Sequence, residues 1–207
     1  MIVKVCGMRE ADNIRQVAQL GIHMMGFIFY QNSPRCVSRP VSRCEADAGV
    51  ERIGVFVNNS VMHILQCIND YNLNGVQLHG QETPEFCRQL KANGVELLLK
   101  ALSVASVNDL KQCGAYDGIV DYFVFDTKTP DYGGSGKCFD WEVLRHYKGT
   151  TPFLLSGGLG MHNTEELLRF QHPRWCGIDL NSCFEVAPGH KDVALLKQYL
   201  QTVREIL

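Results

Sequence analysis

The sequence predicts an α/β protein folded as a compact, eight-stranded parallel (β/α)8 barrel, the TIM-barrel architecture. Eight short apolar runs alternate with stretches of helical pattern along all 207 residues. The runs are nearly continuous in apolar residues, as is typical of parallel strands covered by helices, and eight β/α units favour closure over an open sheet. Since no linker-like segment divides the chain, residues 1–207 are predicted to form one domain.

The elements follow one another in regular order. The predicted strands are residues 2–6, 24–29, 52–57, 75–79, 96–102, 122–126, 152–155 and 176–180. Between strands, apolar residues recur three and four positions apart, which predicts helices at residues 61–71, 84–92, 163–170 and 191–206. An open Rossmann-like sheet is the competing layout, but no Gly-x-Gly-x-x-Gly motif follows the first strand.

Alternation along the strands places a few polar side chains on shared faces. Side chains two positions apart point the same way, so Ile2, Lys4 and Cys6 share one face, and Gln77 shares another with His79. A polar side chain inside a packed barrel must be paired or take part in chemistry. These residues are therefore candidates for a functional site.

Composition excludes several classes of protein. The net charge of −2 and the scattered basic residues argue against a nucleic-acid partner. The sequence has no apolar run of membrane-spanning length and no signal peptide, so a cytoplasmic location is expected. The nine cysteines include no Cys-x-x-Cys pair and the histidines no His-x-x-x-His pair, so neither disulfides nor a metal site is predicted.

Cys6 and Asp126 are the catalytic candidates. Each lies where a predicted strand gives way to a loop, and the C-terminal strand ends of a barrel meet at one mouth. Cys6 is either a buried filler thiol or a general base whose pKa is lowered by nearby positive charge. Asp126 either caps a turn or serves as an acid.

Three loops near the same mouth are candidate binding elements. The Gly-rich segment 128–137, with Gly133, Gly134 and Gly136, is either a closing lid or a plain linker. The loops after the seventh and eighth strands are where barrels commonly hold phosphate. They contain Gly157, Gly158, Asn181 and Ser182.

Two further side chains have a functional and an ordinary interpretation. Arg35 follows the second strand, where its guanidinium suits a carboxylate, although a solvated surface arginine is commoner. His79 ends the fourth strand, and a lone histidine there is more often a hydrogen-bonded core residue.

Taken together, these segments resemble the phosphoribosylanthranilate isomerase family from Lys4 to Asp192, nearly the whole chain. The matching segments are Lys4-Val5-Cys6-Gly7, Gly26-Phe27-Ile28-Phe29, Ser33-Pro34-Arg35, Gly54-Val55-Phe56-Val57-Asn58, Val76-Gln77-Leu78-His79-Gly80, Lys100-Ala101, Asp126, Gly133-Gly134-Ser135-Gly136, Phe139-Asp140-Trp141, Gly157-Gly158-Leu159, Asp179, Ser182, Glu185 and Pro188-Gly189-x-Lys191-Asp192.

The resemblance implies a tryptophan-pathway enzyme that performs a cofactor-free Amadori rearrangement on an anionic phosphosugar. Asp126 then matches the general acid that opens the furanose ring, and Cys6 the general base that removes the proton from sugar C2. Arg35 matches the residue that holds the anthranilate carboxylate. Gly157, Gly158 and the Ser182 loop match the phosphate site.

Some points stay open at this stage. Asp179 either orients the substrate or pairs with a buried lysine, Lys4 or Lys100. The family usually has Ser-Ser-Gly-Val-Glu after the eighth strand, whereas Cys183 stands here at the glycine position, which leaves the phosphate contacts there unsettled.

Two other functions compete with the family reading. The histidine-pathway isomerase runs the same rearrangement with aspartates on strands one and five, where this chain has Cys6 and Lys100-Ala101-Leu102. A non-catalytic phosphosugar-binding barrel would not need both Cys6 and Asp126. The expected assembly is a monomer or a homodimer.

Overall fold

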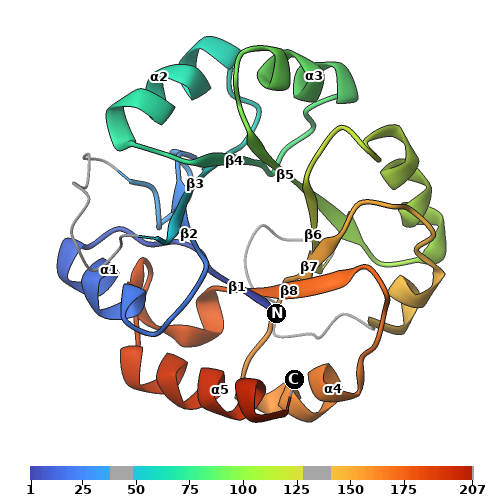
Figure 1. The fold of residues 1–207 in the computed structure, drawn as a ribbon. Coiled ribbons are helices and arrows are strands. Elements are labelled where there is room, and N and C mark those ends of the chain that lie inside the picture. The colour runs from blue at the N-terminus through green and yellow to red at the C-terminus, as the bar shows by residue number, and fades with distance from the viewer. Residues whose placement is uncertain (38–48, 128–140, 207) are drawn as a thin grey trace.

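A closed barrel of parallel strands confirms the predicted fold. The computed structural model describes residues 1–37, 49–127 and 141–206, and its strands pair in sequence from β1 to β8, with β8 closing on β1. In Figure 1 the strands form a ring and the helices lie outside it. The strands are β1 (Ile2–Val5), β2 (Met24–Ile28), β3 (Glu51–Phe56), β4 (Gly75–Leu78), β5 (Leu97–Val104), β6 (Tyr122–Thr127), β7 (Phe153–Leu155) and β8 (Trp175–Leu180).

Helices cover the outside of the barrel. The α-helices are α1 (Ala11–Ala18), α2 (Val61–Tyr71), α3 (Pro84–Ala92), α4 (Thr164–Arg169) and α5 (Val193–Ile206). Short 3-10 helices are η2 (Val107–Ala115), η3 (Trp141–His146), η4 (Met161–Asn163) and η5 (Ser182–Phe184). In the part of the chain that is described, no helix is long and apolar enough to cross a membrane.

The predicted helices at residues 61–71 and 84–92 are confirmed at both ends. The Ser60 and Thr83 side chains accept the backbone N–H groups of His63 and Phe86 and so begin α2 and α3. These hydroxyl groups satisfy amides that have no partner within the helix, which is why both helices start where they do.

The prediction of one helix over residues 191–206 is wrong at its start. Lys191 belongs instead to a small antiparallel ribbon of β9 (Glu185–Ala187) and β10 (His190–Lys191), and α5 begins at Val193. The Asp192 carboxylate accepts the N–H of Leu195 and caps the helix. Lys191 fits the helical spacing of apolar and polar residues, but its ammonium is buried against Glu185, and this contact keeps the residue in the ribbon.

Two apolar clusters lie on either side of the barrel wall. The outer cluster, between strands and helices, includes Val3 and Val5. The inner cluster consists of Met24, Ile53, Leu99, Ala101, Val124 and Leu154, and Ile2 packs against it. The predicted alternation in β1 is confirmed, so Lys4 and Cys6 follow Ile2 on the inner face, toward the C-terminal ends of the strands.

Candidate active site

Cys6 lies immediately after β1 with its thiol facing β2. The Cys6 N–H donates to the Leu180 carbonyl at 2.8 Å, which fixes its backbone against the end of β8. A Cβ atom added at Gly26 would lie 2.6 Å from Cys6 Sγ, closer than atoms can approach. The absence of a side chain at residue 26 therefore makes the space that the thiol occupies.

Lys4 and Asp179 form a buried ion pair beneath Cys6. The Lys4 ammonium lies 2.9 Å and 3.0 Å from the two Asp179 carboxylate oxygens, and the side chains are 0% and 5% exposed. The pairing of β1 with β8 sets Lys4 beside Asp179. Of the two lysines expected as partners, Asp179 takes Lys4, while Lys100 pairs with Glu82.

The charges around Cys6 act on its thiol in opposite directions. Burial raises the pKa of Cys6, the Lys4 and Lys191 ammonium groups oppose the rise, and Asp179 adds to it. Burial alone would lower the pKa of Lys4, but attraction to Asp179 and to Cys6 outweighs it, so the pKa of Lys4 is raised. Lys4 is thus a cation held next to the thiol.

Asp126 and His79 face each other across the same mouth. His79 Nε2 lies 3.5 Å from Asp126 Oδ2, and both side chains are partly exposed. On the other side of the ring, the Gln77 amide nitrogen lies 3.1 Å from His79 Nδ1, which confirms that residues 77 and 79 share a face. When this amide donates to Nδ1, the neutral imidazole carries its proton on Nε2, toward Asp126.

Asp179 links the two catalytic candidates. Its carboxylate interacts electrostatically with Cys6 and Lys4, and also with Asp126 and His79. Residues that are far apart in the sequence therefore meet at the C-terminal end of the barrel, as the parallel topology requires.

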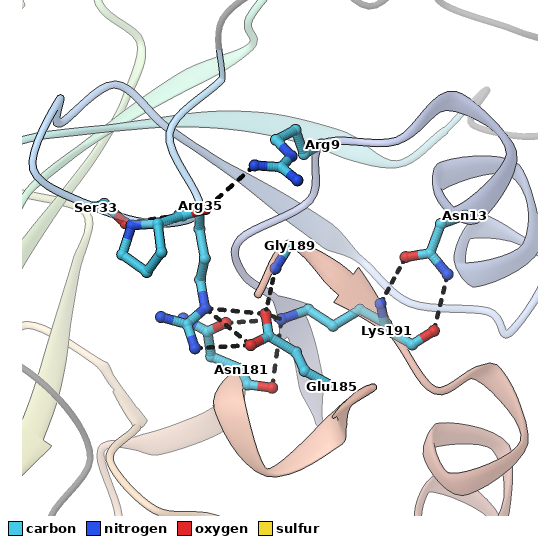
Figure 2. A network of polar contacts seen from close by, with 9 residues as sticks. Arg9, Asn13, Ser33, Arg35, Asn181, Glu185, Gly189 and Lys191 are labelled. Atoms are coloured by element: carbon cyan, nitrogen blue, oxygen red, sulfur yellow. Dashed lines mark hydrogen bonds and ion pairs between the residues drawn. The ribbon is translucent and has the colours of Figure 1, made fainter. Parts of the chain in front are cut away.

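Arg35 lies beside the same site, in a network of charged groups (Figure 2). Its Nε and Nη2 donate to the Glu185 carboxylate at 2.7–2.9 Å. Its Cδ would be 2.9 Å from a Cβ at Gly7, the residue after Cys6, and Gly7 has a left-handed backbone, with φ +78°. The Arg35 side chain is 21% exposed at the mouth. Because it is paired with Glu185, it is not the solvated surface arginine that the ordinary interpretation expected.

The two predicted phosphate loops touch each other. Gly157 and Gly158 have φ values of 81° and 71°, which side chains rarely allow. A Cβ atom at Gly160 would lie 3.1 Å from the Cβ of Cys183, so the loop after β7 packs against η5, which Ser182 begins. The two loops that the sequence assigns to phosphate binding therefore lie against each other.

Two other predictions concern the lid and metals. Gly133, Gly134 and Gly136 lie outside the described residues. Within residues 1–37, 49–127 and 141–206, no three His, Cys, Asp or Glu side chains are grouped in a way that could hold a metal ion.

Two contributors to the site were not assigned roles from the sequence. Glu185 and Lys191 appeared only as family-like residues, and their contact with Arg35 joins loops distant in the chain. No local pattern indicates such a contact. Gln77, in contrast, could have been assigned as the partner of His79, since the two share a strand face.

Comparison with known proteins gives one family. Residues 3–202 match the family model described as N-(5'phosphoribosyl)anthranilate (PRA) isomerase. The N-(5'-phosphoribosyl)anthranilate isomerase of Phocaeicola vulgatus is 50% identical over 206 residues, covering 99% of this chain and 98% of the relative.

Solved structures agree with the sequence match. Phosphoribosyl anthranilate isomerase from Thermotoga maritima has a TM-score of 0.83 at 32% identity and covers 99% of this chain and 100% of its own. A second structure, at 28% identity, TM-score 0.79 and the same coverage, is a phosphoribosyl anthranilate isomerase in complex with reduced 1-(o-carboxyphenylamino)-1-deoxyribulose 5-phosphate.

Proposed function

Because the chain belongs to the N-(5'-phosphoribosyl)anthranilate isomerase family, we propose that it catalyses this isomerisation in tryptophan biosynthesis. N-(5-phosphoribosyl)anthranilate is the substrate and 1-(2-carboxyphenylamino)-1-deoxyribulose 5-phosphate the product of a cofactor-free Amadori rearrangement. The observation that carries the proposal is the position of the buried Asp179 carboxylate, which is paired with Lys4 and interacts electrostatically with both Cys6 and Asp126. A base and an acid are thereby available to one small molecule.

Asp126 is the general acid in this proposal. In its protonated form it donates to the furanose oxygen as the C1–O bond breaks, which opens the ring and leaves an iminium ion between C1 and the anthranilate nitrogen. The position of His79 Nε2 near Asp126 Oδ2 supports this role, because a ring N–H there can hold the carboxylate that results.

Cys6 is the general base. Its thiolate removes the proton from C2, the C2–H electron pair forms the C1–C2 double bond, and the iminium π electrons move onto nitrogen. The resulting enolamine tautomerises to the ketone. Because burial raises the pKa of Cys6, the positive charge of the iminium, added to Lys4 and Lys191, favours the thiolate at the step that needs it.

The remaining site residues bind the substrate. Arg35 holds the anthranilate carboxylate, while Gly157, Gly158 and Ser182 hold the phosphate, with Asn181 beside them. The contact between the loops after β7 and β8 supports the phosphate assignment. His79 and Asp179 orient the sugar between these two ends.

A fluorescence assay tests the function. Purified protein is expected to consume freshly made phosphoribosylanthranilate, and Cys6→Ala and Asp126→Asn are expected to reduce kcat by at least ~100-fold, the usual scale of general acid–base catalysis. Glu165→Gln, on the exposed face of α4, serves as the control with an unchanged rate.

Each outcome separates the competing functions. A protein that binds the phosphosugar without turnover would be a non-catalytic binding barrel. Main activity on the histidine-pathway substrate would identify the other isomerase. Near-wild-type rates in either variant would reject the role of that residue.

We also propose that residues 1–207 act as one domain in the cytoplasm, as a monomer or a homodimer. Light scattering on the purified protein distinguishes the two assemblies. Fractionation of the source cells tests the location.

A further inference from the structure

The β9–β10 ribbon brings two buried charged residues to the edge of the site, and the proposed chemistry gives Glu185 no role. Glu185 begins β9, Lys191 ends β10, and the side chains are 5% and 0% exposed. Figure 2 shows both pointing toward Arg35 and Asn181, which come from the loops after β2 and β8. Taking a charge out of water is costly, and the cost is offset only where the charge is paired and hydrogen-bonded.

Glu185 is held by several donors in addition to Arg35. Lys191 Nζ donates to Glu185 Oε1 at 2.6 Å, and the Gly189 N–H donates to the same oxygen at 3.1 Å. Burial alone would raise the pKa of Glu185, but the bonds from Arg35 and Lys191 outweigh it and hold that pKa below its usual range. Glu185 is therefore a carboxylate fixed in one place.

Lys191 is fixed just as firmly. Its backbone N–H donates to Asn13 Oδ1 at 2.8 Å, and its carbonyl accepts from Asn13 Nδ2 at 2.9 Å, which ties β10 to α1. Its ammonium donates to Asn181 Oδ1 at 2.7 Å as well as to Glu185. One lysine thus joins the start of the η5 loop to the carboxylate that holds Arg35.

The contacts leave part of the Arg35 guanidinium outside the ion pair. Arg35 uses Nε and Nη2 toward Glu185, and Nη1 takes no part in that pair. A planar guanidinium can donate to two carboxylates along two of its edges. Arg35 and Lys191 carry two positive charges, and Glu185 neutralises only one of them. The net positive charge attracts a second carboxylate to the guanidinium.

We propose that Glu185, anchored by Lys191, is a positioning residue that fixes the Arg35 guanidinium so that its remaining edge receives the carboxylate of the substrate. Lys191 also donates to Asn181, and this bond fixes the position of the guanidinium relative to the predicted phosphate loop after β8. The inference deepens the proposed function, since it rests on the anthranilate carboxylate as the group that Arg35 recognises.

A purely structural role for Glu185 makes a different prediction. If Glu185 only holds the ribbon, its loss weakens folding and lowers affinity for every ligand alike. If it positions Arg35, its loss weakens binding of the carboxylate selectively. The informative quantity is therefore a ratio of two affinities.

Calorimetry with two compounds measures this ratio. The first is reduced 1-(o-carboxyphenylamino)-1-deoxyribulose 5-phosphate, and the second is the same compound without its carboxyl group. In the wild type the second is expected to bind about 10- to 100-fold more weakly, the scale of a charge-assisted hydrogen bond. In Glu185→Gln the ratio is expected to fall several-fold toward one, while Glu165→Gln keeps the wild-type ratio.

A second variant and a second background complete the test. Glu185→Asp keeps the negative charge but shortens the side chain by one methylene, which draws the carboxylate back from Arg35, so it supplies the answer if Glu185→Gln does not fold. In an Arg35→Ala background the ratio is expected to be low already, and Glu185→Gln is expected to lower it no further.

The outcomes are distinct from those of the proposed function. Folded Glu185 variants that keep the wild-type ratio of affinities would overturn the inference. So would Glu185→Gln lowering the ratio as much in the Arg35→Ala background as in the wild type. A wild-type protein that binds neither compound would overturn it as well. A wild type that shows the ratio but does not turn over phosphoribosylanthranilate would refute the isomerase activity and leave the positioning role supported.

Discussion

Two buried lysines of the barrel have similar partners and different surroundings. Lys4 on β1 pairs with Asp179, and Lys100 on β5 pairs with Glu82, at 2.9 Å and 3.0 Å. Lys4 lies on the inner face next to Cys6, whereas Lys100 alternates with the inward Leu99 and Ala101 and so faces the helices. The comparison separates what a buried ion pair does for folding from what it does for chemistry.

The outer pair is surrounded by structural contacts. Lys100 Nζ also donates to the Gly80 carbonyl at 2.8 Å and lies 5.9 Å from the centre of the Tyr116 ring. The Glu82 carboxylate accepts the N–H groups of Asn58 and Gly80. Every one of these bonds fixes the loops after β3 and β4, so this pair shapes the barrel wall.

The inner pair is surrounded by groups that can react. The Asp179 carboxylate has Lys4 as its hydrogen-bond partner, and its electrostatic neighbours include Cys6, Asp126 and His79. The lesson is that burial and pairing do not identify a functional lysine. What identifies it is a neighbouring group whose protonation the lysine can change.

Replacing each lysine by methionine has the largest expected effect. Lys4→Met and Lys100→Met should each lower the free energy of unfolding by about 3–5 kcal/mol, because each leaves a buried carboxylate without its cation. Lys4→Met should in addition slow turnover by about 10- to 100-fold, since each unit by which the Cys6 pKa rises removes about nine-tenths of the thiolate.

Urea unfolding and steady-state kinetics at a temperature where both variants are folded measure the two effects. Lys100→Met is the matched control, and its folded fraction should keep a kcat close to that of the wild type. Equal losses of kcat in both variants would show that the comparison between inner and outer pairs is unfounded.

Replacing both partners of each ion pair by apolar residues compares what the two pairs contribute to the free energy of unfolding. Lys4→Met with Asp179→Leu should recover most of the lost free energy of unfolding, because well-packed apolar residues often match a buried ion pair. Lys100→Met with Glu82→Leu should stay about 2 kcal/mol or more below the wild type, since the N–H groups of Asn58 and Gly80 lose their acceptor.

Thermal and urea denaturation of the two double variants give the measurement. The inner double variant should remain inactive although stable, which separates folding from catalysis in one protein. Full recovery by the outer double variant would mean that its backbone donors find other acceptors and that the two pairs differ less than their contacts indicate.

Much of the fold and part of the site follow from the sequence. The eight apolar runs predict the barrel, and alternation along β1 predicts that Lys4 and Cys6 share its interior. The orientation of Lys100 was not predicted, because a parallel strand that is buried on both faces shows no apolar–polar alternation. This is why the partner of Asp179 stayed open between two lysines.

The contact of Arg35 with Glu185 had no sequence signal for a different reason. Both residues lie beyond the ends of the barrel strands, and their meeting depends on the turn of the β9–β10 ribbon around Gly189, whose φ is 82°. Because residues 191–206 were interpreted as one helix, the strand that contains Lys191, and with it the ribbon, was not predicted. Closed topology, not local pattern, brings the two loops together.

The pH dependence of turnover gives the smallest expected effect. If Cys6 acts as a thiolate, kcat/KM rises as pH increases toward the pKa of the thiol, which burial raises above its ordinary value. Lys4 opposes that rise, so Lys4→Met should move the ascending limb of the profile to higher pH. Lys100→Met should leave the limb in place, because Lys100 faces away from the thiol. A limb that shifts in neither variant would mean that the charge on Lys4 does not reach Cys6, and the functional difference between the two pairs would then have to come from Asp179 alone. An equal shift in both variants would mean that the position of Lys4 next to the thiol gives it no effect that Lys100 lacks.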